Sequence, residues 1–324
     1  MTPGSVRLLR DAVRAAARTL SDAGIHSPEF DARALAAFAL GTTTAEVQKS
    51  MIMGAPVPEG FDDLVAERAR RVPLQHLTGI AGFRRLELSV GPGVFVPRFE
   101  TELVAGLAID HLKHLTQARK ARDGATESGV NLGTVQSSVP RSAGPGMAPS
   151  LGLRVVAVDL CAGSGAIALA VKDEVPAAEV HGVELSELAH AWAIHNRDDL
   201  GLDVDIRLGD ATLAFPDLEG EVDVVVSNPP YIPAGAIPND PEVRDHDPEV
   251  ALYGGSPDGL RIPLEVAARA AVLLRPGGLF VMEHADVQGA SLSAALGATW
   301  LWRDIQDHED LNRRPRVVTA LRGE

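Results

Sequence analysis

Residues 155–169 read VVAVDLCAGSGAIAL, which is an apolar run, a glycine turn and the start of a helical pattern. A strand that turns at glycines directly into a helix brings free backbone N–H groups to the helix start, where they favour an anionic group. The glycines also let the backbone approach a ligand closely. The stretch therefore predicts a nucleoside-binding loop at the end of a buried strand.

Apolar runs alternate with helix-length segments through the rest of the chain. The runs after the first one cover residues 180–184, 204–208, 222–227 and 278–283. This rhythm predicts an α/β fold, a Rossmann-like parallel sheet with helices on both faces. Such sheets bind ligands at the carboxyl ends of their strands, near the point where the strand order reverses. Functional side chains are therefore expected directly after strands.

Two carboxylates accompany the glycine turn. Glu184 ends the next strand, nineteen residues past Gly165, and could accept hydrogen bonds from both ribose hydroxyls of a cofactor. The turn also fits the dinucleotide pattern, so the loop alone leaves NAD and S-adenosylmethionine open. Asp159 favours S-adenosylmethionine, because an acid there could meet the cofactor's ammonium group. The predicted cofactor-binding residues are Asp159, Cys161, Ala162, Gly163, Ser164, Gly165 and Glu184.

The sequence Asn228-Pro229-Pro230-Tyr231 directly follows the run at 222–227. An amide or aromatic amine nitrogen is a poor nucleophile because its lone pair is delocalised. The Asn228 side-chain oxygen and the Pro229 carbonyl could grip its N–H bonds and hold it against a methyl donor. Tyr231 offers a flat face for stacking. We therefore predict that Asn228, Pro229 and Tyr231 are catalytic, that all four residues bind substrate, and that the cofactor is S-adenosylmethionine.

The domain organisation follows from changes in the apolar pattern. Residues 1–80 show helical periodicity and predict a small helical domain. Residues 81–96 predict a linking hairpin whose turn is the Gly-Pro-Gly at 91–93. Residues 97–324 form the predicted catalytic domain. Within it, residues 120–150 are rich in Gly, Ser, Ala and Pro, which predicts a disordered insertion.

Composition restricts the function classes. The net charge of −14 argues against a large nucleic-acid-binding face, so no direct nucleic-acid partner is expected. No apolar stretch is long enough to span a membrane, and no signal peptide is visible. The single cysteine fits a reducing, cytoplasmic location. The histidines show no metal-ligand spacing, so no metal is predicted.

Several segments together resemble the release-factor glutamine N5-methyltransferases over most of the chain. These segments are residues 73–79, 96–104, 159–169, 228–231, 247–260 and 277–284. The resemblance implies methylation of the glutamine in the Gly-Gly-Gln loop of peptide-chain release factors, which would be the protein partners. It also implies cofactor contacts from 161–165, Glu184 and Asn228, with Asp210 and Ala211 against the adenine.

The chain departs from the family pattern at a few positions. The family usually has Gly-Thr where this chain has Cys161-Ala162, proline at Phe99 and glycine at Arg313. These differences leave room for a relative with another acceptor. One alternative is an adenine-N6 methyltransferase on DNA or RNA, because the same loop suits an exocyclic amine of a flipped base. The other alternative is a non-catalytic cofactor-binding protein, which the intact acceptor loop disfavours.

Overall fold

The computed structural model describes residues 7–127 and 154–324, which fall into two compact units. The first unit contains the chain up to Pro97 together with residues 235–252. The second unit contains residues 98–234 and 253–324. In these described ranges no helix is long and apolar enough to cross a membrane.

The first unit is a helical cluster, as its sequence pattern predicts. Its helices bury one shared apolar core, in which Leu9, Leu35 and Phe61 are fully enclosed. Ser27 precedes the second helix and Pro28 occupies its first turn, where a missing N–H costs nothing. The helices are α1 (Leu9–Asp22), α2 (Pro28–Leu40), α3 (Thr44–Ile52), α4 (Phe61–Ala69) and α5 (Leu74–Thr78).

A hairpin follows these helices, but its position differs from the prediction. Strand β1 (Ile80–Phe83) pairs antiparallel with β2 (Leu86–Ser89), so the turn lies at residues 84–85. Residues 91–94 do form a turn, in which the Val94 N–H donates to Gly91 O at 3.4 Å, but residues 94–96 are not a strand, so the hairpin predicted around this turn is wrong. Alternate residues of both strands are buried, namely Ala81 and Phe83 on β1 and Leu86 and Leu88 on β2. The partner strand lies before β2 rather than after it.

Residues 235–252 join the first unit through a buried ion network. They contain α9 (Pro241–His246) and the short helix η2 (Glu249–Ala251). Arg68 Nη1 donates to Glu242 Oε1 at 2.8 Å, and Arg71 Nε donates to Glu242 Oε2 at 2.9 Å. Arg68 Nε also donates to Asp31 Oδ2 at 2.7 Å. Glu242 thus ties α9 to helices α2 and α4 of the same unit.

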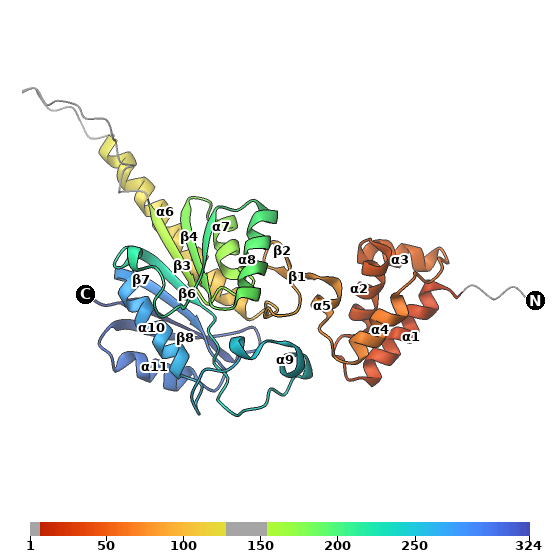
Figure 1. Ribbon diagram of the computed structural model, residues 1–324. Coiled ribbons are helices and arrows are strands. Elements are labelled where there is room, and N and C mark those ends of the chain that lie inside the picture. The colour runs from red at the N-terminus through yellow and green to blue at the C-terminus, as the bar shows by residue number, and fades with distance from the viewer. Residues whose placement is uncertain (1–6, 128–153) are drawn as a thin grey trace, which may run out of the picture. The chain divides into compact units, whose positions relative to one another are not determined.

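The second unit is built on a seven-stranded sheet with the order β5-β4-β3-β6-β7-β9-β8, in which β9 is antiparallel to both of its neighbours. Helices α6, α7 and α8 lie on one face, and α10 and α11 on the other (Figure 1). The strands are β3 (Val155–Leu160), β4 (Ala178–Glu184), β5 (Val204–Leu208), β6 (Val222–Ser227), β7 (Leu274–Glu283), β8 (Trp302–Glu309) and β9 (Pro315–Arg322). The helices are α6 (Thr101–Glu127), α7 (Ala166–Glu174), α8 (Glu187–Leu200), η1 (Pro216–Leu218), α10 (Arg261–Leu273) and α11 (Gly289–Gly297).

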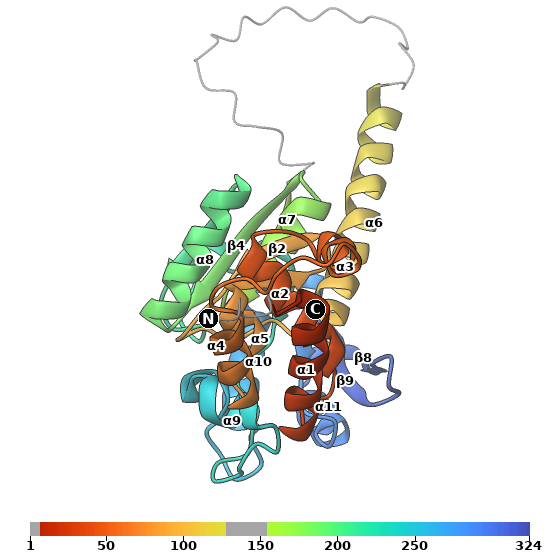
Figure 2. The same ribbon diagram turned by 90° about the vertical axis from the view of Figure 1, so that its right-hand side faces the viewer.

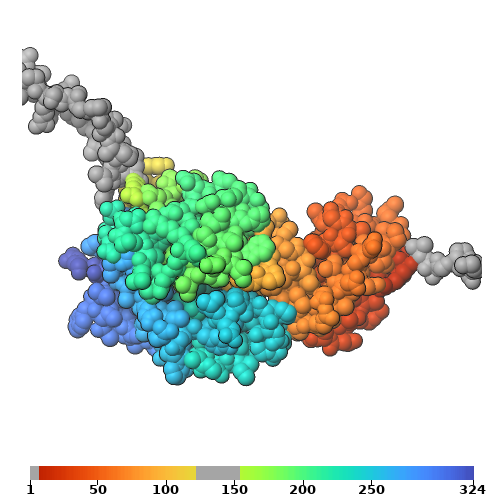
Figure 3. Space-filling model, in the orientation of Figure 1, coloured from red at the N-terminus to blue at the C-terminus, as the bar shows by residue number. Residues whose placement is uncertain are grey.

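Each apolar run named from the sequence is a strand of this sheet, so the predicted α/β class is confirmed. The buried cluster between the sheet and α10 includes Val158, Phe280 and Met282, and Phe280 stacks on Trp302 of β8 at 5.0 Å between ring centroids. In the space-filling view the green segments around α7 and α8 and the blue segments of α10 and α11 form one continuous surface (Figure 3).

Helix α6 runs further than expected. It continues to Glu127, so residues 120–127 are helical although they were assigned to the disordered insertion. The long yellow helix is seen side-on in Figure 2. The remainder of the predicted insertion, up to residue 150, lies in 128–153, outside the described residues.

The turn between β8 and β9 explains one departure from the family pattern. Arg313 is exposed and has φ +59°, a left-handed conformation that costs an L residue about 1–2 kcal/mol. Glycine adopts this conformation freely but loses about 0.5–1 kcal/mol more entropy on folding. Arg313→Gly should therefore raise the free energy of unfolding by about 0.5–1 kcal/mol, measured by urea denaturation. The neighbouring Arg314→Gly, where φ is not positive, should lower it instead, and the opposite order would refute the strain argument.

Candidate active site

The two loops predicted to carry function leave neighbouring strands. Strands β3 and β6 are parallel, with Leu160 opposite Ser227, so Cys161 and Asn228 begin their loops side by side. The strand order reverses here, because β3 leads outward to β4 and β5 while β6 leads to the other half of the sheet. This is the switch point at which such sheets bind ligands. The structure therefore brings the glycine loop and the Asn-Pro-Pro-Tyr loop to one edge.

The glycine loop is held against β4 by its backbone. The Cys161 and Ala162 N–H groups donate to Val183 O at 3.1 and 2.9 Å, and the Gly163 N–H donates to Glu184 Oε2 at 2.8 Å. Gly163 has φ +58°, and a Cβ built there would meet no atom within 4 Å. The loop is therefore anchored on one side and open on the other, which is the shape a ligand cradle needs.

The two carboxylates near this loop differ in exposure to a ligand. Glu184 Oε1 accepts the Ser186 N–H at 2.8 Å, and burial raises the pKa of Glu184. Asp159 is 1% exposed and lies beneath the loop, where its Oδ2 accepts the Ala168 N–H at 3.0 Å. Burial raises the pKa of Asp159 to about 7, and its Oδ1 has no hydrogen-bond partner among the residues that the structure describes. A buried carboxylate oxygen without a partner marks a place for a donor group.

The other predicted cofactor residues occupy the surroundings of the loop. Cys161 has φ +75°, and burial raises the pKa of its thiol, so it is not an activated nucleophile. Ser164 is buried, and its carbonyl accepts from Asn196 Nδ2 at 3.0 Å. Asp210 Oδ1 accepts the N–H and hydroxyl of Thr212, both at 2.8 Å, so it caps its own loop. Ala211 belongs to the apolar core beside Val183.

The acceptor loop is tied into a hydrogen-bonded network from three elements. Asn228 Nδ2 donates to Thr101 Oγ1 at 3.1 Å, and Thr101 Oγ1 donates to Glu283 Oε2 at 2.7 Å. The Tyr231 hydroxyl donates to Glu283 Oε1 at 3.1 Å. Thr101 begins α6, Glu283 ends β7, and both are buried. Burial raises the pKa of Glu283 to about 7 and also raises the pKa of Tyr231.

The backbone of the acceptor loop is also held by residues 254–259 and by Gln288. Gln288 Nε2 donates to both Tyr231 O at 2.9 Å and Asp258 O at 2.8 Å. Gly259 has φ +75°, and a Cβ built there would lie 2.1 Å from Tyr231 O, so only glycine fits. The Gly254 N–H donates to Ile232 O at 2.9 Å. These contacts hold the carbonyl side of the loop in one position.

Three of these supporting residues were not identified as functional from the sequence. Thr101 and Glu283 lie in segments that carry the family resemblance, but neither pattern shows that they meet. Gln288 carried no signal at all. Their partners are far away in the chain, with 182 positions between Thr101 and Glu283 and 57 between Gln288 and Tyr231.

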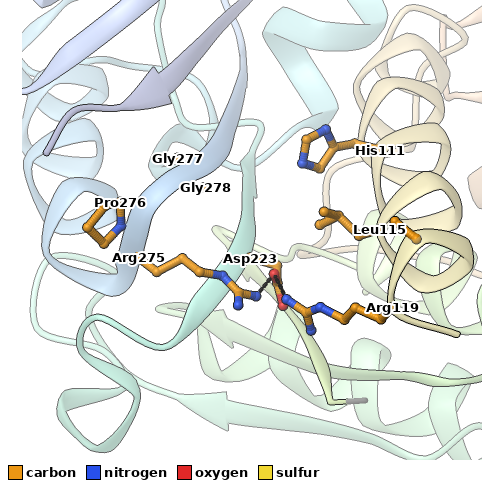
Figure 4. Close-up of a pocket in the computed structure, with 9 residues that line it drawn as sticks. His111, Leu115, Arg119, Asp223, Arg275, Pro276, Gly277 and Gly278 are labelled. Carbon is orange, nitrogen blue, oxygen red and sulfur yellow. Dashed lines mark hydrogen bonds and ion pairs between the residues drawn. The ribbon is translucent and has the colours of Figure 1, made fainter. Parts of the chain in front are cut away.

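A separate cavity of about 250 Å³ lies near the amino ends of β6 and β7, away from these loops (Figure 4). Arg119 of α6 donates to Asp223 Oδ1 at 2.7 Å, and Arg275 forms an ion pair with the same oxygen. The other oxygen of Asp223 accepts the Val156 N–H at 2.9 Å. The carboxylate is thus satisfied, and its contacts join α6, β3, β6 and β7. We interpret this cluster as a structural element.

The site and the sheet together define an α/β methyltransferase domain, and comparisons with known proteins agree. The PrmC N-terminal domain model matches residues 11–79, and the Methyltransferase small domain model matches residues 149–239. A release factor glutamine methyltransferase of Streptomyces coelicolor is 46% identical, and the match covers 98% of this chain and 99% of that protein. One from Bifidobacterium longum is 38% identical, over 92% and 97%.

The chain therefore belongs to the release factor glutamine methyltransferase family, as its motifs predict. A relative named for a different activity also matches. The 4-amino-L-phenylalanine/4-methylamino-L-phenylalanine methyltransferase of Streptomyces pristinaespiralis is 37% identical over 97% of this chain and 95% of that protein. Its acceptor is an aromatic amine, so similarity at this level spans two acceptor types.

Proposed function

We propose that this chain transfers the methyl group of S-adenosylmethionine to the side-chain nitrogen of the glutamine in the Gly-Gly-Gln loop of a peptide-chain release factor. The observation that supports it most is the acceptor loop itself, in which Asn228 and Tyr231 are both anchored beside the glycine loop. Membership of the family supports the choice of glutamine. The substrate and the single cysteine support a cytoplasmic location.

The residues present fit the cofactor. Gly163 leaves open space over the loop, and Glu184 stands at the end of β4, where a ribose would lie. The unpartnered Asp159 oxygen suits an ammonium group reached through the loop. Leu185 and Leu213 are apolar and more than half exposed near the ends of β4 and β5, which suits the faces of an adenine. Asp210 and Ala211 would complete that side.

The chemistry that the cofactor supplies when bound is an electrophilic methyl group. The chain's part is to hold the acceptor. Asn228 Oδ1 and the Pro229 carbonyl accept hydrogen bonds from the two N–H groups of the amide. This directs the nitrogen lone pair toward the methyl donor. Pro230 stiffens the loop, and Tyr231 provides a flat surface for the planar amide. No strong base is needed, because the nitrogen can lose its proton to water or to a carbonyl oxygen after the methyl group has been transferred.

An aromatic amine is a second candidate acceptor, because the Streptomyces pristinaespiralis relative is named for one. The amino group of 4-amino-L-phenylalanine carries two N–H bonds and that of 4-methylamino-L-phenylalanine carries one, and both have a delocalised lone pair. A flipped adenine shares these properties. The net charge of −14 disfavours a nucleic acid, because phosphate binding needs a basic face.

The test offers the purified protein radiolabelled S-adenosylmethionine with a recombinant release factor, 4-amino-L-phenylalanine, or unmethylated DNA and RNA. Label should enter the release factor and disappear when the Gly-Gly-Gln glutamine is replaced by alanine. Label in the amino acid or the nucleic acid, with none in the release factor, would contradict the proposed function and would indicate that the labelled compound is the substrate.

A further inference from the structure

We propose that Glu283, acting through Thr101 and Tyr231, determines that the acceptor site presents hydrogen-bond acceptors to its substrate, so that the site selects a nitrogen carrying two N–H bonds. We call this arrangement the hydrogen-bond polarity of the site. Glu283 is a positioning residue in this role, since its buried carboxylate acts through its hydrogen bonds to Thr101 and Tyr231. The inference rests on the proposed function, because it concerns how that same site selects its acceptor.

The single hydroxyl hydrogen of Thr101 fixes the direction of its hydrogen bonds. A threonine hydroxyl has one hydrogen, and an ionised carboxylate only accepts. The short distance of 2.7 Å between Thr101 Oγ1 and Glu283 Oε2 places that hydrogen on the bond between them. Thr101 therefore faces Asn228 with lone pairs only. It follows that Asn228 must turn its NH₂ group, and not its oxygen, toward Thr101, as the 3.1 Å contact has it.

The orientation of Asn228 determines which of its atoms face the methyl acceptor. With its NH₂ group held by Thr101, Asn228 has its side-chain oxygen on the other side of the amide. Tyr231 is restricted in the same way, because its only hydroxyl hydrogen points at Glu283 Oε1. The loop thus presents three hydrogen-bond acceptors, namely the Asn228 side-chain oxygen, the Pro229 carbonyl and the lone pairs of the Tyr231 hydroxyl.

This polarity discriminates between acceptor classes. An amide or amine nitrogen can satisfy two acceptors with its two N–H bonds. A hydroxyl can satisfy one, and a carbonyl or carboxylate oxygen satisfies none and adds repulsion. Because a polar group left without a partner in a closed site costs about 1–3 kcal/mol, the rejection is substantial. The carboxylate at 283 is the origin of this selection, since both hydroxyls take their direction from it.

The surroundings of Glu283 make this polarity sensitive to pH. The side chain is 2% exposed, and burial raises its pKa to about 7. Arg316 on β9 opposes the shift and Glu100, just before α6, adds to it. The neighbouring His284 directs its ring nitrogens to Ala285 O and Asp307. When Glu283 takes up a proton it becomes a donor, and one hydroxyl must turn its hydrogen elsewhere.

The first arm of the test compares Thr101→Val with Thr101→Ser on the release factor. Valine keeps the shape of threonine but cannot accept from Asn228, so kcat should fall by about 10–100-fold while the affinity for S-adenosylmethionine is kept. Serine keeps the hydroxyl and should stay near the wild type. Equal activity of both variants, or an equal loss in both, would overturn the proposal, because packing alone would then explain the position.

The second arm is the pH profile. Since the ionised carboxylate is the competent form, kcat/KM of the wild type should rise with pH through about 7. Thr101→Ser should keep this limb. Glu283→Gln, which has a permanent donor, should be slower and flat over the same range. A flat wild-type profile, or an unchanged limb in Glu283→Gln, would contradict the assignment.

A third arm needs no acceptor and separates this inference from the proposed function. In protein labelled with ¹⁵N-asparagine, the Asn228 side-chain NH₂ signal, assigned by its loss in Asn228→Asp, should exchange slowly with solvent in wild type and in Thr101→Ser. It should exchange rapidly in Thr101→Val. If this exchange pattern is observed while no label enters the release factor, the proposed function is wrong but the proposed role of Glu283 and Thr101 in orienting Asn228 is supported. Rapid exchange of this signal in the wild type would refute the fixed orientation of Asn228, whatever the substrate is.

Discussion

Replacing Asn228 by alanine is expected to lower kcat for release factor methylation by about 10²–10³-fold, the loss typical of removing one preorganised polar contact to a reacting group. The variant removes the oxygen that accepts one amide N–H, and it leaves Thr101 facing a void. The glycine loop and Glu184 are untouched, so S-adenosylmethionine should still bind, with a modestly raised Kd. Single-turnover kinetics and isothermal titration calorimetry give the two quantities separately.

The matched control for this variant is Asn239→Ala, because Asn239 is an exposed asparagine in the same connection, outside the site. It should leave kcat and cofactor affinity unchanged. If Asn228→Ala instead raised KM for the release factor with kcat intact, Asn228 would contribute only uniform binding and the proposed role in transfer would be wrong.

Glu242→Ala should strongly destabilise the helical unit, with a loss of about 3–5 kcal/mol in the free energy of unfolding, because it leaves buried arginine charge uncompensated. Glu242 is 8% exposed and binds both Arg68 and Arg71, and Arg68 is itself buried. Urea denaturation followed by circular dichroism measures the change. Release of α9 should also make residues 235–252 more sensitive to protease.

Asp245→Ala on the same helix provides the comparison. Asp245 pairs with the adjacent Arg244 at the surface, and such exposed pairs contribute little. Its unfolding curve should overlay that of the wild type. A Glu242→Ala protein that unfolds at the wild-type urea concentration would show that the ion network does not hold α9 in place.

Much of the catalytic unit could be predicted because its signals are local. The apolar runs at 155–160 and 222–227 are strands within a residue of their expected limits, and the glycine turn and Asn228 follow them directly. The meeting of these two loops follows from general rules of parallel sheets. The left-handed conformations of Cys161 and Arg313 also agree with the two positions where the family usually has glycine.

The features that could not be predicted depend on contacts between residues that are far apart in the sequence. The hairpin turn was misplaced because Gly-Pro-Gly at 91–93 is a stronger turn signal than the Arg-Arg pair at 84–85 that makes the turn. Residues 120–127 have a composition typical of loops but continue a helix already nucleated by the buried face of α6. Glu283 was one carboxylate at the end of one strand, and its role emerges only when β6, β7 and α6 are packed together.

The segment 235–252 has a consequence for how this protein can be divided or recombined. It is inserted between the acceptor loop and its supporting residues, yet it folds with the helical unit. No single cut in the gene therefore separates the two units. A chimaera that exchanged only the first 97 residues with a distant relative would pair α9 with foreign helices, and a workable exchange must carry both stretches together. The helical unit and the acceptor loop are thus expected to have been inherited as a pair.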